Sequence, residues 1–466
     1  MHETAEPQKT AVIAALQLPL VSDAEHASDV AELRRLLKTL GYDVVGVVSQ
    51  RRAGPRAAAV LGPGKLLELA AYTGGTGVVP AYSANKGKGK GGDGDGDEDA
   101  GPEALDAAEE VDEADETDTV AAGDAGPLTH ADVVVVDHEI SPRQARNLEK
   151  ALDAEVLDRT GVIVEIFHRH ANTREARLQV EIARLDYVVP RLRAGVRGNE
   201  RQRGKGAGES SLELDRRKVR DRIAELKGEL VVIARDEAQR RSRRQQVPRV
   251  ALVGYTNAGK SSLMRALTGS EVLVQDKLFA TLGTTVRALH PEATPRVLVS
   301  DTVGFIKKLP HHLVASFRST LDEALEAQLL LYVVDCSDPN FRSQLEITRE
   351  VLADIGASET ESRLLLNKVD KITPEELAVL RAELPDAIPL SAHDPADVAA
   401  LYELVLGYFQ RDHLETTLLI PYRRGQLVGQ VHASMRVIDE QHDEHGTHLR
   451  VRAAAADIER VLAQLR

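Results

Sequence analysis

A glycine-rich stretch of the chain has the residue types and spacing of a loop that binds a triphosphate. Gly254 and Gly259 enclose four residues and are followed directly by Lys260 and Ser261, which is the P-loop pattern. In such a loop, backbone N–H groups converge on the phosphates, the lysine bridges the β- and γ-phosphates, and the serine hydroxyl binds Mg²⁺. The predicted contacts are Gly254, Tyr255, Thr256, Asn257, Ala258, Gly259, Lys260, Ser261 and Ser262.

A second pattern selects the base of the nucleotide. The apolar run "LLLNKVD" ends in Asn367, Lys368, Val369 and Asp370. The carboxylate of Asp370 can accept from N1–H and the exocyclic amine of guanine, whereas adenine has no such donor pair. Sites of this kind reject the wrong ligand by about 10⁴ or more. Farther on, "PLSAH" ends in Ser391, Ala392 and His393, and we expect the N–H groups of Ser391 and Ala392 to contact guanine O6.

A third group of residues is typical of nucleotide switches. A predicted strand, "PRVLVSD", ends in Asp301 and is followed by Thr302, Val303 and Gly304. We expect Asp301 to hold Mg²⁺ through water and the N–H of Gly304 to meet the γ-phosphate. A threonine between the P-loop and Asp301 should complete the Mg²⁺ shell, and three qualify by position: Thr281, Thr284 and Thr285. This order of motifs indicates a guanine-nucleotide switch domain.

The residue after Gly304 is unusual for such a switch. Phe305 stands where Ras-like enzymes have the glutamine that orients the attacking water. Phenylalanine has no side-chain atom that can do this. The remaining groups, Lys260, Mg²⁺ and the N–H of Gly304, stabilise charge on the phosphates but leave the nucleophile loose. The sequence therefore predicts slow intrinsic hydrolysis that a partner stimulates.

The charge of the chain is concentrated in two segments. The net charge is −14 over 466 residues, and residues 83–127 hold 15 acidic side chains against three lysines. We expect this segment to be a disordered insertion. Residues 191–244 carry 17 Arg and Lys against nine Asp and Glu.

The location of the protein is predicted from features that the sequence lacks. The single cysteine, Cys336, excludes an internal disulfide, and the sequence has neither a long apolar run nor a signal pattern. We therefore expect a cytoplasmic protein without a membrane contact.

The elements that position these motifs are those of an α/β protein. Apolar strand runs alternate with helical patterns over 11–165, including "ADVVVVD" and "GVIVEIF" as strands and a helix around 27–40. The predicted fold is a P-loop GTPase domain with a doubly wound, mostly parallel sheet at 247–411. It is preceded by a small α/β subdomain (11–165) with a long helical hairpin (166–246) and followed by a small α+β domain (412–466), in which we expect two or three strands and a helix over 454–465.

The hairpin is predicted from two heptad patterns. The first comprises Leu178, Ile182, Leu185 and Val189, and the second comprises Val219, Ile223, Leu226, Leu230 and Ile233. They should fold as an antiparallel pair of helices, the second running from 210 to 244. The connecting loop holds five glycines, three arginines and a lysine between residues 195 and 208. Helix packing does not require a loop of this composition, whereas binding to a phosphate backbone does. We therefore expect contact with RNA.

At this level of detail the sequence resembles the HflX family of ribosome-associated GTPases. The resemblance rests on "HEISPRQARNLEKAL", "VLDRTGVIVEIFHRHANTREARLQVEIARLDYVVPRL", "GKGAGESSLELDRR" and "FATLGTTVR". It implies binding of GTP or GDP with Mg²⁺, association with the large ribosomal subunit and its RNA, and splitting or rescue of stalled ribosomes under stress. It selects Thr281 as the Mg²⁺ ligand beside Ser261 and adds Phe279, Ala280, Leu282 and Gly283 to the nucleotide contacts.

The resemblance also leaves points open. Asn257 lies where several related GTPases coordinate K⁺ with an asparagine, so K⁺ is a second candidate cation. The family usually has Asp-Pro-Thr where this chain has Gly283-Thr284-Thr285, and its hairpin tip differs at Ala207, Ser210 and Ser211. Alternatives are a GTPase for ribosome assembly or RNA modification and a Ras-like switch for protein effectors. A P-loop kinase is disfavoured because the "NKVD" and "DTVG" stretches have no role there. We expect the free protein to be monomeric.

Overall fold

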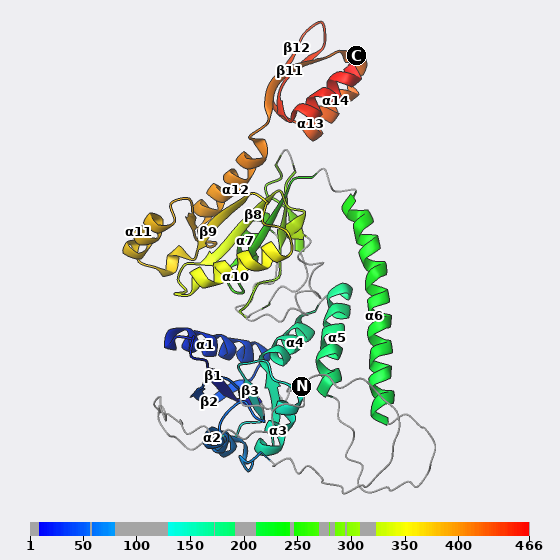
Figure 1. The fold of residues 1–466 in the computed structure, drawn as a ribbon. Coiled ribbons are helices and arrows are strands. Elements are labelled where there is room, and N and C mark those ends of the chain that lie inside the picture. Colours follow the sequence, from blue (N-terminus) through cyan, green and yellow to red (C-terminus); the bar gives the residue numbers. More distant parts are fainter. Residues whose placement is uncertain are drawn as a thin grey trace, which may run out of the picture. The chain divides into compact units, whose positions relative to one another are not determined.

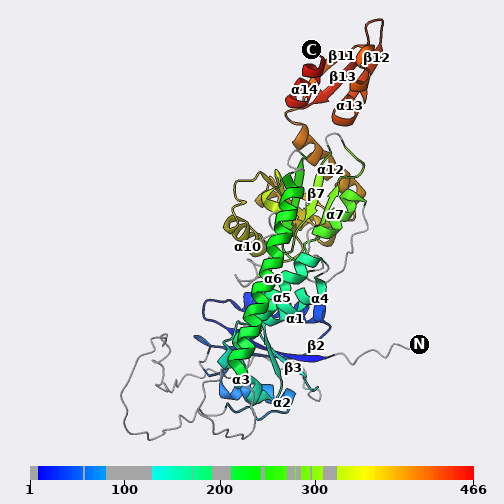
Figure 2. The same cartoon turned by 90° about the vertical axis from the view of Figure 1, so that its right-hand side faces the viewer.

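The structure is a computed structural model that describes residues 9–55, 58–79, 129–171, 173–191, 211–242, 247–269, 279, 285–293, 296–307 and 323–465. The acidic insertion at 83–127 and the basic loop at 195–208 lie outside these residues. The chain divides into two compact units, Met1–Arg159 and Thr160–Arg466, whose elements are labelled in Figures 1 and 2. Within the described ranges, no helix is long and apolar enough to cross a membrane.

The first unit is built on a four-stranded parallel sheet. Its strands are β1 (Thr10–Gln17), β2 (Asp43–Arg51), β3 (Val133–Val136) and β4 (Glu155–Asp158), in the order β2-β1-β3-β4. The connecting helices are α1 (Asp23–Leu40), α2 (Pro63–Thr73) and α3 (Pro142–Leu152). α1 begins earlier than predicted because the side chain of Ser22 caps it by accepting from the N–H of Glu25.

A buried ion cluster lies in this unit. The guanidinium of Arg159 donates to the carboxylates of Glu32, from α1, and Asp137, which follows β3; the bond to Asp137 is 3.1 Å long. All three side chains are at most 6% exposed. Because charges removed from water are costly unless paired, this cluster ties α1 to the carboxyl ends of β3 and β4.

The stretch "GVIVEIF" is helical, and its prediction as a strand is wrong. Residues 161–167 belong to α4 (Arg159–His170), and the strand is the preceding segment, β4. Ile163 and Ile166 are both fully buried. The run is apolar at nearly every position, so its sequence shows neither the period of a helix nor that of a strand, and a buried helix has the same pattern.

The helical hairpin is present as predicted. α5 (Arg174–Val188) is followed by a 3₁₀ turn (Val189–Arg191), and α6 covers Ser211–Ser242. Both heptad patterns meet in one hydrophobic cluster, which includes every predicted residue except Ile233. An ion pair of 2.9 Å joins Arg174, at the start of α5, to Glu229, in the second half of α6. The two helices are therefore antiparallel, and they lie side by side in Figures 1 and 2.

The predicted switch domain contains a six-stranded sheet in the order β10-β9-β8-β5-β7-β6. All neighbours are parallel except β6 and β7. The strands are β5 (Arg249–Gly254), β6 (Thr285–Ala288), β7 (Leu298–Asp301), β8 (Leu329–Asp335), β9 (Ser362–Asn367) and β10 (Ile388–Leu390). The helices are α7 (Lys260–Thr268), α10 (Phe341–Asp354), α11 (Pro374–Glu383) and α12 (Pro395–Gln410).

Two hydrophobic clusters bury this sheet. One contains α7 and α12 through Leu263 and Leu401, and the other contains α10 and α11 through Phe341 and Leu380. β5 lies at the point where the strand order reverses, because the next strands in the sequence, β6 and β7, are on one side of it and β8 is on the other. Ligands of doubly wound folds bind at the carboxyl ends of the strands at such a point, which here is the P-loop.

The last segment forms a three-stranded antiparallel sheet with two helices. Its elements are β11 (Leu414–Ile420), α13 (Gln426–Ser434), β12 (Arg436–His442), β13 (Thr447–Ala453) and α14 (Ala455–Leu465), with the sheet order β11-β13-β12. The strands and α14 agree with the sequence prediction. α13 was not predicted.

Candidate functional site

The P-loop follows β5 with a backbone that its two glycines permit. Gly254 has φ +153°, and a β-carbon there would lie 2.2 Å from the carbonyl oxygen of Val333. Gly259 has φ +99°, and a β-carbon there would lie 2.1 Å from Nδ2 of Asn367. Side chains at either position would therefore clash with β8 or β9. The glycines allow the loop to approach both strands closely.

Lys260 lies at the centre of the loop and is buried. Its ammonium donates to the carbonyl oxygens of Gly254 and Tyr255 at 3.0 and 2.8 Å. Burial lowers the pKa of Lys260 to about 8, although the nearby carboxylate of Asp301 acts in the opposite direction. The ammonium is thus held by the backbone of the loop, and contact with phosphate would favour its charged form.

Two of the residues expected around Mg²⁺, Ser261 and Asp301, lie together. The hydroxyl of Ser261 donates to the carboxylate of Asp301 at 2.7 Å. Described residues form no cluster of three or more His, Cys, Asp or Glu suited to a metal. A hydroxyl and one carboxylate beside phosphate oxygens is the all-oxygen environment that Mg²⁺ takes in such enzymes, so these residues fit the ion. When bound, Mg²⁺ neutralises charge on the phosphates.

The "NKVD" residues connect the P-loop to the neighbouring strands. Asn367 donates through Nδ2 to the carbonyl of Ala258 at 2.8 Å and accepts through Oδ1 from the N–H of Ala392 at 3.1 Å. Lys368 donates to the carbonyl of Asn257 and to the carboxylate of Asp335, both at 2.7 Å. Hydrogen bonds thus join the residues expected to contact the phosphates to those expected to contact the base.

The predicted base contact, Asp370, is held by a hydrogen bond. Ser391 donates its hydroxyl to Oδ1 of Asp370 at 2.6 Å, and this bond lowers the pKa of the carboxyl group, which is therefore ionised near neutral pH. The N–H of Ser391 donates to Asp397 at 2.7 Å, and that of Ala392 donates to Asn367. Contact of these two N–H groups with guanine O6 would therefore require them to share or exchange these acceptors. His393 follows in the same loop, and Val369 lies in the turn that contains Asp370.

The segment 301–307, called switch II here, lies against the P-loop. The N–H of Thr256 donates to the carbonyl of Phe305 at 2.8 Å, and the N–H of Phe305 donates to the carbonyl of Gly254 at 3.1 Å. The hydroxyl of Tyr255 accepts from the N–H of Lys307 at 2.6 Å. A β-carbon on Gly304 would lie 3.0 Å from Nζ of Lys260. The structure therefore brings Gly304 directly beside the lysine.

Only part of the predicted switch I stretch is described. Phe279 is buried, has φ +59°, and meets the ring of Phe167, from α4, edge to face with centroids 4.6 Å apart. This arrangement fixes the backbone two residues before Thr281. Ala280, Thr281, Leu282 and Gly283 lie outside the described residues. Asn257 is exposed and also has a left-handed backbone, with φ +61°.

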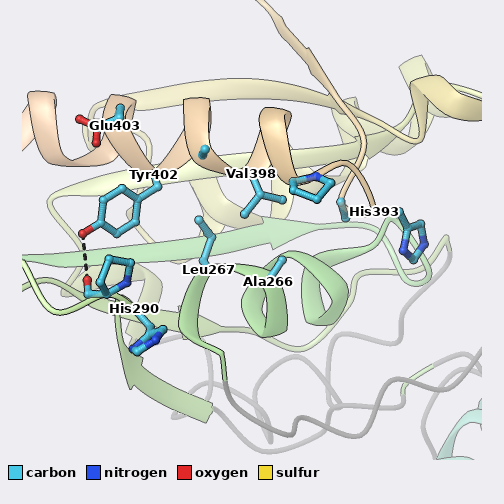
Figure 3. Close-up of a pocket in the computed structure, with 11 residues that line it drawn as sticks. Ala266, Leu267, His290, His393, Val398, Tyr402 and Glu403 are labelled. Carbon is cyan, nitrogen blue, oxygen red and sulfur yellow. Dashed lines mark hydrogen bonds between the residues drawn. The ribbon is translucent and has the colours of Figure 1, made fainter.

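A hollow of about 530 Å³ lies beside the loop that contains Ala392 and His393, between α7 and α12 (Figure 3). Its walls are mostly apolar and include Leu267 and Val398, and the hydroxyl of Tyr402 donates across it to the carbonyl of Pro291 at 2.8 Å. Ala392 and His393 line it as well. On the side that faces the hollow, therefore, the loop that contains Ala392 and His393 is not held by close packing.

Two acidic residues of the site were not predicted from the sequence. Asp335, the partner of Lys368, is the last residue of β8, and a carboxylate at the carboxyl end of a buried strand was a signal that could have identified it. Asp397, the partner of Ser391, lies in the first turn of α12. No local pattern marked it.

Three protein-family models match successive parts of this chain. The family described as "GTP-binding GTPase N-terminal" matches residues 27–79 and 114–168, "GTP-binding GTPase Middle Region" matches 170–244, and "50S ribosome-binding GTPase" matches 249–368. Among solved structures, a GTP-binding protein from Sulfolobus solfataricus in complex with GDP is 22% identical and has a TM-score of 0.41, covering 85% of this chain and 99% of its own.

Two relatives named GTPase HflX are closely similar in sequence. The protein from Gluconacetobacter diazotrophicus is 58% identical over 463 residues, which is 99% of each chain. The protein from Escherichia coli (strain K12) is 38% identical over 354 residues, covering 74% of this chain and 83% of the relative. The predicted family and fold class are confirmed, the chain is a GTP-hydrolysing enzyme, and P-loop GTPases generally use Mg²⁺. The chain belongs to the HflX family of GTPases.

Proposed function

We propose that this GTPase binds the large ribosomal subunit and splits or rescues stalled ribosomes under stress, with GTP hydrolysis timing its release. The printed description of the family that matches residues 249–368, "50S ribosome-binding GTPase", is the observation that carries the proposal. The cytoplasmic location follows from this partner.

The surface of α6 supports a contact with RNA. Arg220, Lys227 and Arg235 are exposed on this helix, while its buried residues Ile223 and Leu226 face α5. Arginine and lysine side chains on an exposed helix are the groups that neutralise phosphates of a nucleic acid. A switch for protein effectors has no use for such a surface.

The catalytic part of the proposal assigns a role to each site residue. Lys260 and the N–H of Gly304 bind the γ-phosphate, and Ser261 and Thr281 hold Mg²⁺. Asn257 is the side chain for a K⁺ ion that would add positive charge near the phosphates. With Phe305 in place of glutamine the isolated enzyme hydrolyses GTP slowly, and contact with the ribosome orders the attacking water.

Cosedimentation with purified ribosomal subunits at several salt concentrations tests the partner. Replacing Arg220, Lys227 and Arg235 with glutamine should weaken binding and lower the slope of log K against log salt, by up to about 0.7–0.9 for each lost phosphate contact. The matched control replaces three exposed arginines elsewhere, Arg287, Arg349 and Arg381, and should bind as the wild type does. Equal binding by both triple variants would remove α6 from the contact, and wild-type binding only to immature subunits would favour the assembly alternative.

A further inference from the structure

Four hydroxyl side chains lie where the P-loop meets switch II, and three of them have hydrogen-bond partners. Ser261 donates to Asp301 at 2.7 Å, Thr302 donates to the carbonyl of Leu252 at 2.8 Å, and Tyr255 accepts from the N–H of Lys307. Oγ1 of Thr256 differs from these. It is buried and has no hydrogen-bond partner among the residues that the structure describes.

A buried hydroxyl without a partner destabilises a protein, because the group has lost its hydrogen bonds to water. Valine has the same shape as threonine and would avoid this cost. Thr256 is 7% exposed, and its backbone is held in place by the bond from its N–H to the carbonyl of Phe305. The hydroxyl is therefore fixed at this point at a cost in stability, which is typical of residues that serve function.

Thr256 lies beside the glycine of switch II, with its Cα and its methyl group toward it. A β-carbon on Gly304 would lie 2.8 Å from both Cα and Cγ2 of Thr256 and 3.0 Å from Nζ of Lys260. The hydroxyl is attached to the same β-carbon as Cγ2. Thr256 thus borders the place between Lys260 and Gly304 where these two groups are expected to meet the γ-phosphate.

We propose that Oγ1 of Thr256 is a catalytic hydroxyl that positions the attacking water, which is the role that Phe305 cannot fill. It accepts a hydrogen bond from the water. The water oxygen then forms a bond to the γ-phosphorus while the bond from that phosphorus to the β-γ bridging oxygen breaks. The electron pair leaves with GDP, and the proton of the water passes to an oxygen of the departing phosphate.

The threonine does not act as a base in this step. A threonine hydroxyl is far too weak a base to keep a proton of water near neutral pH, so its contribution is orientation. The inference rests on the GTPase activity and is independent of ribosome binding.

The test compares Thr256→Val and Thr256→Ala with Thr256→Ser, which retains the hydroxyl. Removing one precisely placed hydrogen-bonding group from an active site typically costs about 10²–10³ in rate, so single-turnover hydrolysis by Thr256→Val should fall about 100-fold. Affinities for GDP and for a non-hydrolysable GTP analogue should stay within about threefold of the wild type, since the hydroxyl contacts the water and not the nucleotide. Thr256→Ser should retain most of the rate.

Thermal stability separates this role from a structural one. The melting temperature of Thr256→Val should be unchanged or higher, because the substitution removes a buried hydroxyl without a partner. The matched control is Thr348→Val in α10, whose hydroxyl is buried and donates to the carbonyl of Gln344 at 2.8 Å. It should lower the melting temperature and leave the hydrolysis rate unchanged.

The proposal is overturned if Thr256→Val and Thr256→Ala both hydrolyse GTP at the wild-type rate, or if Thr256→Ser is as slow as they are. It is also overturned if the lower rate is accompanied by an equal loss of affinity for the GTP analogue. That result would place the hydroxyl in ground-state binding.

Discussion

Tyr255 and Phe305 form a parallel β-bridge that joins the P-loop to switch II. The carbonyl of Phe305 accepts from Thr256, its N–H donates to Gly254, and the residue is 3% exposed. Phe305 therefore replaces a mobile glutamine with a buried anchor. Its backbone holds switch II on the P-loop, and its ring has no polar atom that could orient water.

Replacing Phe305 with glutamine should not restore fast hydrolysis. The substitution places a polar amide in a buried apolar site, where an unpaired group costs about 1–3 kcal/mol. We expect a lower free energy of unfolding and a single-turnover rate no higher than that of the wild type. The matched control, Phe305→Leu, keeps the site apolar and should lose less stability. A stable Phe305→Gln variant with a strongly raised rate would show that the ring only blocks the water.

The substitution Asp370→Asn tests the choice of base. The amide nitrogen cannot accept from the exocyclic amine of guanine, and a mismatch of this kind lowers affinity by about 10⁴. Binding of GTP and xanthosine triphosphate, measured by titration calorimetry, should shift in favour of the xanthine nucleotide. Ser391→Ala, which removes the donor to Asp370, should have a smaller effect in the same direction on GTP. Unchanged GTP affinity in Asp370→Asn would contradict the assignment.

The motifs that carry this chemistry were predictable because they are local. The P-loop and the "NKVD" stretch each follow a strand whose apolar residues are continuous in the sequence. The partners of these residues were not predictable from the local sequence. Ser391 bonds to Asp397 only because the chain turns into α12, and Thr256 bonds to Phe305 only because the strands that precede them, β5 and β7, are neighbours in the sheet.

The fold was predicted less well where composition did not separate helix from strand. "GVIVEIF" is apolar at almost every position and therefore fits a buried helix as well as a strand. α13 contains Gly429 in its interior and begins after Gly425, and glycine lowers helix propensity by about 1 kcal/mol relative to alanine. Packing of Leu427 and Val431 into the core of the last segment forms this helix, and the local sequence does not show that core.

The affinity for GTP should depend on pH through Lys260. Because burial lowers the pKa of Lys260 to about 8 from 10.5, the free protein loses the ammonium as the pH rises through about 8. GTP affinity should then fall by up to about tenfold per pH unit. The free energy of unfolding should show the opposite trend: between about pH 8 and 10.5 the unfolded state binds more protons, so this group's contribution to stability rises with pH.

The variant Lys260→Arg is the control for this dependence. Its guanidinium keeps its proton throughout this range, so binding should be weaker but free of the step near pH 8. A flat pH profile in the wild type would contradict the lowered pKa.

The buried ion cluster of the first unit gives a prediction on stability. Glu32→Ala leaves Arg159 with one fewer carboxylate in a site where all the side chains are nearly inaccessible. Breaking a buried pair typically costs about 3–5 kcal/mol, and chemical denaturation would measure the loss. Glu383→Ala breaks an exposed pair with Arg342 and should change stability little. Equal, small effects would show that the cluster is accessible to water.

Single-turnover hydrolysis of GTP, with and without large ribosomal subunits and in Na⁺ or K⁺, tests the central claim most directly. The isolated protein should hydrolyse GTP slowly, because Phe305 cannot orient water. A partner that completes the site should raise the hydrolysis rate by about 10³–10⁵, as a catalytic group supplied in trans does in comparable enzymes. Acceleration by large subunits is the predicted result. Fast hydrolysis by the isolated protein that responds to neither subunits nor K⁺ would contradict the account.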